Sequence, residues 1–203
     1  MIAKFVNNLF SYTFLFHMFR LTSYLKSLSK PKVVFDVGAY KGQFGNSFKT
    51  SKVFFFEPNK DFFKKLRKNK KDYYFNIGLG NKNIQKSFYI TPNASSSSFN
   101  KPTLGKTLKI IFFYDVLKEK YKKTKVKIYP LNYFFKKYKL QKIDILKIDT
   151  EGFEFNVLKG LKKNYNKIKL IYFEHHYDDM ILKNYKFSKK NKLLNDYGFK
   201  MIK

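Results

Sequence analysis

The feature that most constrains the fold is a series of short, mostly apolar runs that alternate with helical segments. These runs are Val33–Phe35, Val53–Phe56, Tyr73–Phe75, Ile143–Ile148 and Ile168–Phe173. Runs of this length without regular polar alternation are typical of strands that are covered on both faces of a parallel sheet. The segments between them carry apolar residues on one helical face, such as Phe62, Phe63 and Leu66. We therefore predict an α/β fold with a doubly wound, mostly parallel sheet and helices on both of its faces.

The remaining segments give weaker patterns. Ser87–Ile90 and Val126–Tyr129 are interpreted as added strands, and Tyr197–Ile202 as a last edge strand. Lys106–Tyr121 is interpreted as a helix, and the Ser-, Pro- and Gly-bearing residues 91–105 as a loop. No internal repeat divides the chain.

The first 30 residues differ from the rest, so we divide the chain into an N-terminal helical segment, residues 1–30, and an α/β domain, residues 31–203. The uncharged stretch between Lys4 and Arg20 has 15 residues, which is too short and too polar for a membrane-spanning helix. No small-residue cleavage site follows it, so we expect no cleavable signal peptide and a cytoplasmic protein. We expect a helix packed on the domain; the alternative is peripheral membrane contact through residues 1–29.

The chain is strongly basic, with 43 Lys and Arg against 14 Asp and Glu and a formal charge of +29. Such a charge suggests an anionic partner. However, Arg20 and Arg67 are the only arginines, and phosphate-binding surfaces usually favour the arginine fork. The abundant Lys, Asn, Phe, Tyr and Ile are the residues that A/T-rich codons encode. We attribute most of the excess to codon bias and expect no nucleic-acid partner. The absence of cysteine excludes thiolate metal sites and cysteine nucleophiles.

The few acidic residues gather at the ends of the predicted strands. Five of the 14 lie at predicted strand ends, namely Asp36, Glu57, Asp149, Glu151 and Glu174. In doubly wound sheets, ligands bind at the carboxyl ends of the strands, near the point where the strand order reverses. A strand-end acid also caps helices, but five of them at one end of a sheet indicate a ligand site.

The glycine turn from Gly38 to Gly42 follows the first strand and lets a ligand approach the backbone. Glu57 ends the second strand, 21 residues after Asp36, where an acid accepts the hydroxyls of a bound ribose. Together they indicate an adenosine cofactor. The turn lacks the third glycine of the dinucleotide fingerprint, and an acid beside it suits a cation. This favours S-adenosylmethionine over NAD.

These motifs resemble one known family. Asp36–Gln43, Glu57–Pro58, Lys147–Glu154 and Val157–Gly160 look like the FkbM-type S-adenosylmethionine-dependent methyltransferases, and Asn93–Phe99 is similar to their serine-bearing loop. The Lys-Ile-Asp-x-Glu-Gly element is the most specific part. The resemblance implies a Rossmann-like class I methyltransferase fold and methyl transfer to an alcohol oxygen. It implies a small-molecule or glycan acceptor, such as a sugar or a secondary metabolite.

The resemblance also implies roles for matching residues. Those expected to line the methionine moiety are Asp36, Gly38, Ala39 and Gly42. Glu57 would bind the ribose, and Asn76 and Ile77 the adenine edge. Asp149 and Glu151 would face the sulfonium and the acceptor. Lys147 would be a structural partner, with a catalytic role as the alternative.

Methyl transfer to an alcohol needs positioning and a group that takes the hydroxyl proton. The candidates for this base are Asp149, Glu151 and His175. An alternative is a divalent ion held by Asp149, Glu151 and Glu174 or His175, which would lower the hydroxyl pKa. His175 and His176 have an ordinary interpretation too, as a pair divided between core and surface.

Two other functions remain open at this point. A nucleic-acid (RNA) methyltransferase would use the basic surface, but amino-group methylation of bases usually employs an Asn/Asp-Pro-Pro-aromatic element where Asp149-Thr-Glu-Gly stands here. A noncatalytic adenosine-binding module is the other. The oligomeric state and the identity of the acceptor do not follow from the sequence.

Overall fold

The computed structural model describes residues 20–27, 30–91, 97–101, 121–173 and 186–201. Residues 20–27 form a helix. The strands are β1 Val33–Val37, β2 Lys52–Phe56, β3 Tyr73–Phe75, β4 Gly78–Gly80, β5 Ile84–Ile90, β6 Lys122–Pro130, β7 Ile143–Ile148 and β8 Ile168–Phe173. The helices are α2 Gln43–Asn46, α3 Lys60–Lys65, α4 Leu131–Lys137, α5 Glu154–Lys159, the 3-10 helix η3 Lys162–Lys167 and α6 Phe187–Asp196.

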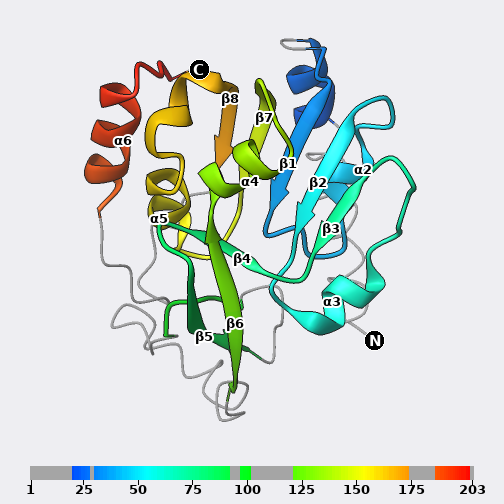
Figure 1. Ribbon diagram of the computed structural model, residues 1–203, viewed down its shortest axis with the longest axis vertical. Helices are drawn as coiled ribbons and strands as arrows, with labels where there is room; N and C mark the ends of the chain where they lie inside the picture. The colour runs from blue at the N-terminus through cyan, green and yellow to red at the C-terminus, as the bar shows by residue number, and fades with distance from the viewer. Residues whose placement is uncertain (1–19, 28–29, 92–96, 102–120, 174–185, 202–203) are drawn as a thin grey trace, which may run out of the picture.

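Five strands form one all-parallel sheet in the order β3-β2-β1-β7-β8. The order reverses between β1 and β7, where Asp36 lies beside Lys147 in register. All five carboxyl ends therefore lie at the same end of the sheet (Figure 1). This arrangement confirms the predicted α/β, Rossmann-like fold.

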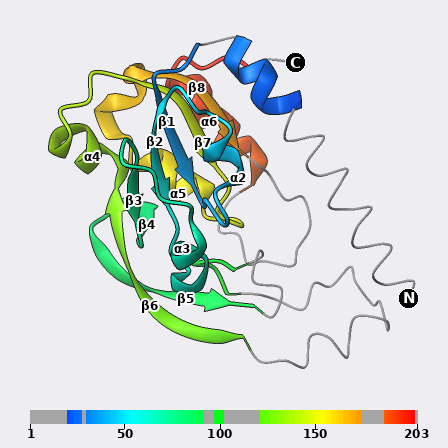
Figure 2. The same cartoon turned by 90° about the vertical axis from the view of Figure 1, so that its right-hand side faces the viewer.

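Helices cover both faces of this sheet (Figure 2). One face presents Val34, Phe55 and Ile145 to the helix at residues 20–27 and to α2, where Leu25 and Phe48 complete the core. The other face contributes its own apolar residues, among them Phe54 and Leu146, to a larger core that also takes in residues of α4, α5 and α6. Strands buried from both sides explain why their sequences are continuous apolar runs.

A second, three-stranded sheet lies across the carboxyl ends of the parallel strands (Figure 1). Its order is β4-β6-β5, with β4 parallel and β5 antiparallel to β6. Close backbone packing joins it to α5, because a Cβ at Gly160 would collide with the carbonyl oxygen of Gly80. Phe99, which lines the inner side of this sheet, contacts Phe88 and Phe153 at ring-centroid distances of 4.9 and 5.1 Å.

Several predictions for the outer segments need correction or extension. Residues 197–201 are not a strand; they continue from α6 as a turn and irregular chain. The strands predicted at Ser87–Ile90 and Val126–Tyr129 are confirmed, but they belong to the second sheet. The predicted helix at residues 106–121 lies outside the described residues except for Tyr121, which is not helical.

The described part of the N-terminal segment packs on the domain, since Leu25 is buried in the core. Residues 1–19 lie outside the described residues, so the division at residue 30 stays a prediction. Within the described ranges, no helix has the length and apolar character needed to cross a membrane.

Candidate active site

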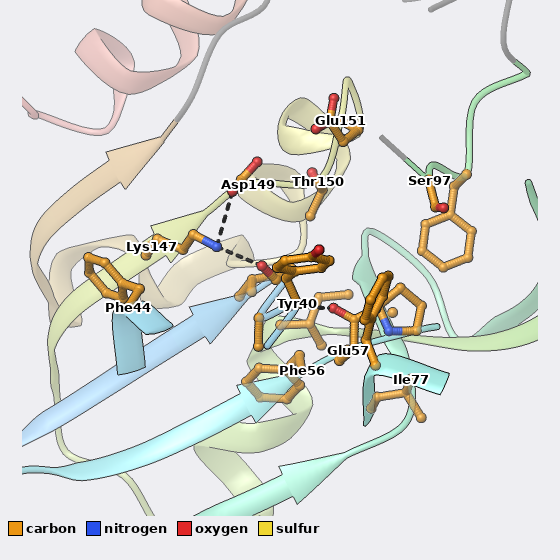
Figure 3. Close-up of a pocket in the computed structure, with 18 of the residues that line it drawn as sticks. Tyr40, Phe44, Phe56, Glu57, Ile77, Ser97, Lys147, Asp149, Thr150 and Glu151 are labelled. Atoms are coloured by element: carbon orange, nitrogen blue, oxygen red, sulfur yellow. Dashed lines mark hydrogen bonds and ion pairs between the residues drawn. The ribbon is translucent and has the colours of Figure 1, made fainter. Parts of the chain in front are cut away.

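A cavity of about 650 Å³ opens at the carboxyl end of the parallel sheet, over the point where the strand order reverses. Its walls come from the ends of β1, β2, β7 and β8, from the second sheet and from the helix at residues 20–27. The residues that line it include Gly38, Ala39, Tyr40, Phe44, Glu57, Phe62, Ile77, Ser97, Phe99, Lys147, Asp149, Thr150, Glu151 and Tyr172 (Figure 3).

The glycine turn after β1 is fixed from two sides. The N–H groups of Gly38 and Ala39 donate to the carbonyl oxygen of Phe56 at 3.0 and 3.1 Å. On the other side, a Cβ at Gly38 would collide with the carbonyl oxygen of Asp149, and its φ of 74° is in the left-handed region. Only glycine allows the strand ends of β1 and β7 to approach this closely. The turn thus forms the cavity floor at the reversal point.

Glu57 is a buried carboxylate at the end of β2, with only 5% of the residue exposed. Its Oε2 accepts from the N–H of Tyr40 at 2.6 Å, and its Oε1 accepts from the N–H of Asn59 at 2.7 Å. Burial raises the pKa of Glu57 to about 7, against the opposing effect of these two hydrogen bonds. Each oxygen keeps a further lone pair for a hydroxyl donor in the cavity.

Two aromatic side chains, those of Tyr40 and Phe62, line the same cavity as Glu57. Tyr40 has a φ of 52°, and its ring lies 4.3 Å from that of Phe62, centroid to centroid. Asn76 fixes the neighbouring backbone, since its Nδ2 donates to the carbonyl oxygens of Glu57 and Pro58 at 2.8 and 3.2 Å. Asn76 therefore shapes the cavity from outside, whereas Ile77 lines it.

A buried ion cluster underlies the reversal point. The Nζ of Lys147 lies 3.2 Å from Asp36 Oδ1 and 3.3 Å from Asp149 Oδ2, and it donates to the Gly38 carbonyl oxygen at 2.6 Å. Lys147 and Asp149 point toward one another beside the glycine turn (Figure 3). Asp36 is fully buried, and its Oδ2 accepts from the N–H of Gly45 at 3.0 Å. Burial raises the pKa of Asp36, opposed by the Lys147 charge.

The loop after β7 has an unusual backbone that a buried glutamate supports. Glu151 and Gly152 have φ values of 51° and 89°, so two consecutive residues are left-handed. The Oε1 of Glu154 accepts from the N–H groups of Thr150 and Gly152 at 3.2 and 2.9 Å, and from the Thr150 hydroxyl at 3.1 Å. Glu154 thus holds the loop that carries Asp149 and Glu151.

A segment distant in sequence also holds this loop. The hydroxyl of Ser98 donates to the carbonyl oxygen of Glu151 at 2.6 Å, and Asn100 Nδ2 donates to that of Gly152 at 2.6 Å. Ser98 itself pairs with Tyr89 of β5 through backbone hydrogen bonds. The second sheet is therefore linked directly to the loop at the cavity.

The structure brings most of the sequence-predicted site residues together. Those that line the cavity are Gly38, Ala39, Glu57, Ile77, Asp149 and Glu151. Asp36, Gly42 and Asn76 lie behind its walls, so they shape the cavity rather than line it. Glu174 and His175 lie outside the described residues. In the described part of the chain, no three acidic or histidine side chains gather closely enough to hold a metal ion.

Sequence reasoning missed several cavity residues. The ion pairs of Lys147 with Asp36 and Asp149 agree with the expected structural partner, but its place in the cavity lining was not predicted. A signal was present, because a lysine inside an otherwise apolar buried strand requires a carboxylate partner. Tyr40, Phe62 and Tyr172 gave no comparable signal, because the sequence does not distinguish an aromatic residue of the cavity from one of the core.

Comparison with known proteins adds one finding. The model of the family described as the methyltransferase FkbM domain matches residues 36–201. No curated protein and no solved structure matches the chain. The matched region contains the glycine turn, Glu57, the Lys147 cluster and the loop after β7. The chain belongs to the FkbM-domain methyltransferase family.

Proposed function

We propose that this chain is an S-adenosylmethionine-dependent O-methyltransferase that acts on a hydroxyl of a sugar, a glycan or a secondary metabolite. The observation that carries the proposal is the Glu57 carboxylate. It ends β2, both of its oxygens are held by backbone N–H groups, and it lines a cavity of about 650 Å³. An acid at this place in a doubly wound sheet accepts ribose hydroxyls.

The residues that line the cavity have the chemistry needed to bind each part of the methyl donor. Glu57 would accept the ribose hydroxyls, and the aromatic rings of Tyr40 and Phe62, with Ile77, would pack against the adenine. The methionine end would lie at the Gly38 turn and Asp149. The donor is a sulfonium cation, and the carboxylates at the cavity make this region suitable for a positive charge although the whole chain is strongly basic.

The bound donor supplies an electrophilic methyl group, and this chain's residues have the task of positioning the acceptor and removing its proton. Asp149 and Glu151 both line the cavity, and the Asp149 side chain is 32% exposed. A carboxylate within hydrogen-bond reach of an alcohol takes its proton as the new C–O bond forms. Two carboxylates at this place support an alcohol acceptor.

Donor binding is tested first, by isothermal titration calorimetry with S-adenosylmethionine and with NAD. We expect S-adenosylmethionine to bind and NAD not to bind. Glu57→Gln should weaken donor binding by at least about tenfold, since one backbone N–H and the ribose lose a charged acceptor. Asp144→Asn is the matched control. Asp144 also accepts from two backbone N–H groups, those of Lys32 and Val33, but at the opposite end of the sheet. Equal loss in both variants would contradict the assignment.

The acceptor class is tested with methyl-labelled donor and separate fractions of glycans, small metabolites and RNA. We expect label in a hydroxyl-bearing fraction, as an ether that resists mild base. Glu151→Gln should bind the donor normally and transfer the label more slowly. Label in RNA, or none in any fraction despite donor binding, would favour a nucleic-acid methyltransferase or a noncatalytic adenosine-binding protein instead.

A further inference from the structure

We propose that Lys147 is the positioning residue of the methyl-transfer site: it ties the glycine turn after β1 to Asp149 after β7 and thereby fixes the place of the donor's methyl group. The inference rests on the proposed function. It concerns a residue within the cavity wall that sequence reasoning treats as structural support.

The geometry of Lys147 favours a role that is exerted through its protein partners. An ammonium has three N–H donors, and three protein oxygens lie within 3.3 Å of Nζ: those of Gly38, Asp36 and Asp149. The side chain is only 8% exposed. Lys147 donates a hydrogen bond to the Gly38 carbonyl oxygen and forms ion pairs with the two carboxylates, so it acts through these partners.

The protonation state of Lys147 agrees with this role. Burial lowers the pKa of a lysine, but the charges of Asp36 and Asp149 more than offset this effect and raise the pKa of Lys147 above its usual value. The side chain is therefore a permanent cation and does not serve as a base. What it contributes is a fixed point between two carboxylates and one carbonyl group.

The three partners belong to both halves of the doubly wound sheet. Asp36 and Gly38 are at the end of β1, and Asp149 follows β7, so the Lys147 contacts span the reversal point of the strand order. Lys147 holds Asp149 through its Oδ2 at 3.3 Å, and Asp149 itself lines the cavity. Displacement of reacting atoms by even a small distance slows a transfer reaction strongly.

Lys147 also has a structural task, which the experiment must separate. Asp36 is fully buried, and its Oδ1 has no hydrogen-bond partner beyond the ion pair with Lys147. Lys147→Met therefore leaves a buried charge uncompensated and should lower the melting temperature by about 10 °C. The double variant Lys147→Met with Asp36→Asn removes the cation and the buried anion together. It should regain most of the lost melting temperature. The double variant should thus keep the fold but lack the contacts through which Lys147 joins the glycine turn to Asp149.

The test follows the ¹³C NMR signal of methyl-labelled S-adenosylmethionine bound to each variant, together with melting temperature without donor. Lys190→Met is the matched control, because Lys190 is also fully buried but lies in α6 over the ring of Phe173. We expect the double variant to bind the donor within about threefold of the wild-type affinity, since the adenosine end is unaffected. Its methyl signal should move toward that of free donor, while Lys190→Met should leave the signal unchanged.

Each other outcome has a definite meaning. A double variant that binds donor with the wild-type methyl signal overturns the role of Lys147 and leaves the proposed function intact. A wild-type protein that binds no S-adenosylmethionine overturns both. If the double variant does not fold, Asp149→Asn weakens the hold of Lys147 on the loop after β7, and an unchanged methyl signal there overturns the inference.

Discussion

At each end of the parallel sheet, carboxylates accept hydrogen bonds from backbone N–H groups, but the carboxylates serve different purposes at the two ends. At the amino end, Asp144 Oδ2 accepts from the N–H groups of Lys32 and Val33 at 2.8 and 3.0 Å, and Asp72 Oδ1 accepts from that of Val53 at 2.9 Å. At the carboxyl end, Glu57 accepts from two loop N–H groups in the same way. The first carboxylates complete strand beginnings, whereas Glu57 lines a cavity.

The pKa values show what this difference means. Burial raises the pKa of Asp144, but the hydrogen bonds from Val33 and Lys32 and the nearby Lys142 outweigh it, so the pKa is lowered overall. At Glu57, burial dominates and raises the pKa to about 7. The charge of Asp144 therefore stabilises the fold, and the charge of Glu57 opposes it. A carboxylate kept at such a cost to stability is typical of a functional site.

The largest expected effect concerns the glycine turn at the carboxyl end. Gly38→Ala places a Cβ onto the carbonyl oxygen of Asp149, so β1 and β7 must separate locally. We expect a loss of about 4 kcal/mol or more in the free energy of unfolding and no donor binding. Gly198→Ala is the control, because Gly198 has a φ of 83° but no atom near the added Cβ. It should cost about 1 kcal/mol and leave the site unaffected.

The second prediction is that Glu57 and Asp144, at opposite ends of the sheet, change the free energy of unfolding in opposite directions as pH rises. Between pH 4.5 and about 7, folded Glu57 keeps a proton that the unfolded chain has released. Its contribution to the free energy of unfolding therefore falls as pH rises through this window, by about 3 kcal/mol in total. The contribution of Asp144 is present above its unfolded pKa of 3.8 and is lost as pH falls below that value.

Urea unfolding of the wild type, Glu57→Gln and Asp144→Asn between pH 3 and 8 measures both effects. The decline that Glu57 causes should be absent in Glu57→Gln, and the deficit of Asp144→Asn should shrink only at the most acidic pH. Donor affinity should change in the other direction, rising as Glu57 ionises between pH 6 and 8. A donor affinity that is flat over this range would contradict the role of Glu57.

The link between the second sheet and the cavity loop gives an intermediate effect. Ser98→Ala removes the hydroxyl that donates to the Glu151 carbonyl oxygen, and Ser98 is buried. We expect a loss of about 1 kcal/mol in stability and faster hydrogen exchange in residues 150–153, with no change at the amino end of the sheet. Exchange that rises equally at Lys32 and Val33 would show that the loop is not held locally.

The smallest expected effect is at the amino end. Lys142 lies 3.0 Å from Asp144 Oδ1, but its side chain is 60% exposed. Exposed ion pairs contribute little, so Lys142→Ala should change the free energy of unfolding by less than about 1 kcal/mol, as measured by urea unfolding. A larger loss would mean that the lysine, rather than the backbone N–H groups, is what keeps Asp144 ionised.

Strand positions in the parallel sheet followed closely from the sequence. The predicted strands Ile143–Ile148 and Ile168–Phe173 agree with β7 and β8, because burial on both faces leaves a clear apolar run. The second sheet was not anticipated as a unit. Its strand β4 is Gly78–Gly80, and two glycines in three residues indicate a turn unless the close approach of Phe99 and α5 is known.

Some residues of the site could be predicted from the sequence, and others could not. Placement of Glu57, Asp149 and Glu151 followed from their position after apolar runs, since parallel strands bring their carboxyl ends together. The position of Asp36 behind the cavity wall could not be predicted, because only the register of β1 and β7 sets Lys147 beside it. The supports from Ser98 and Asn100 come from 53 and 52 residues away in sequence, a distance at which local patterns carry no information.

The short strand β3 at one margin of the parallel sheet has a consequence for solubility. A margin of a Phe-rich sheet offers unpaired backbone groups to another molecule and invites aggregation. Here that margin is only three residues long, Tyr73–Phe75, and Lys68, Lys70 and Lys71 precede it. Repulsion between such lysines on two molecules keeps their sheets from joining. Part of the large positive charge thus protects the apolar strands from self-association.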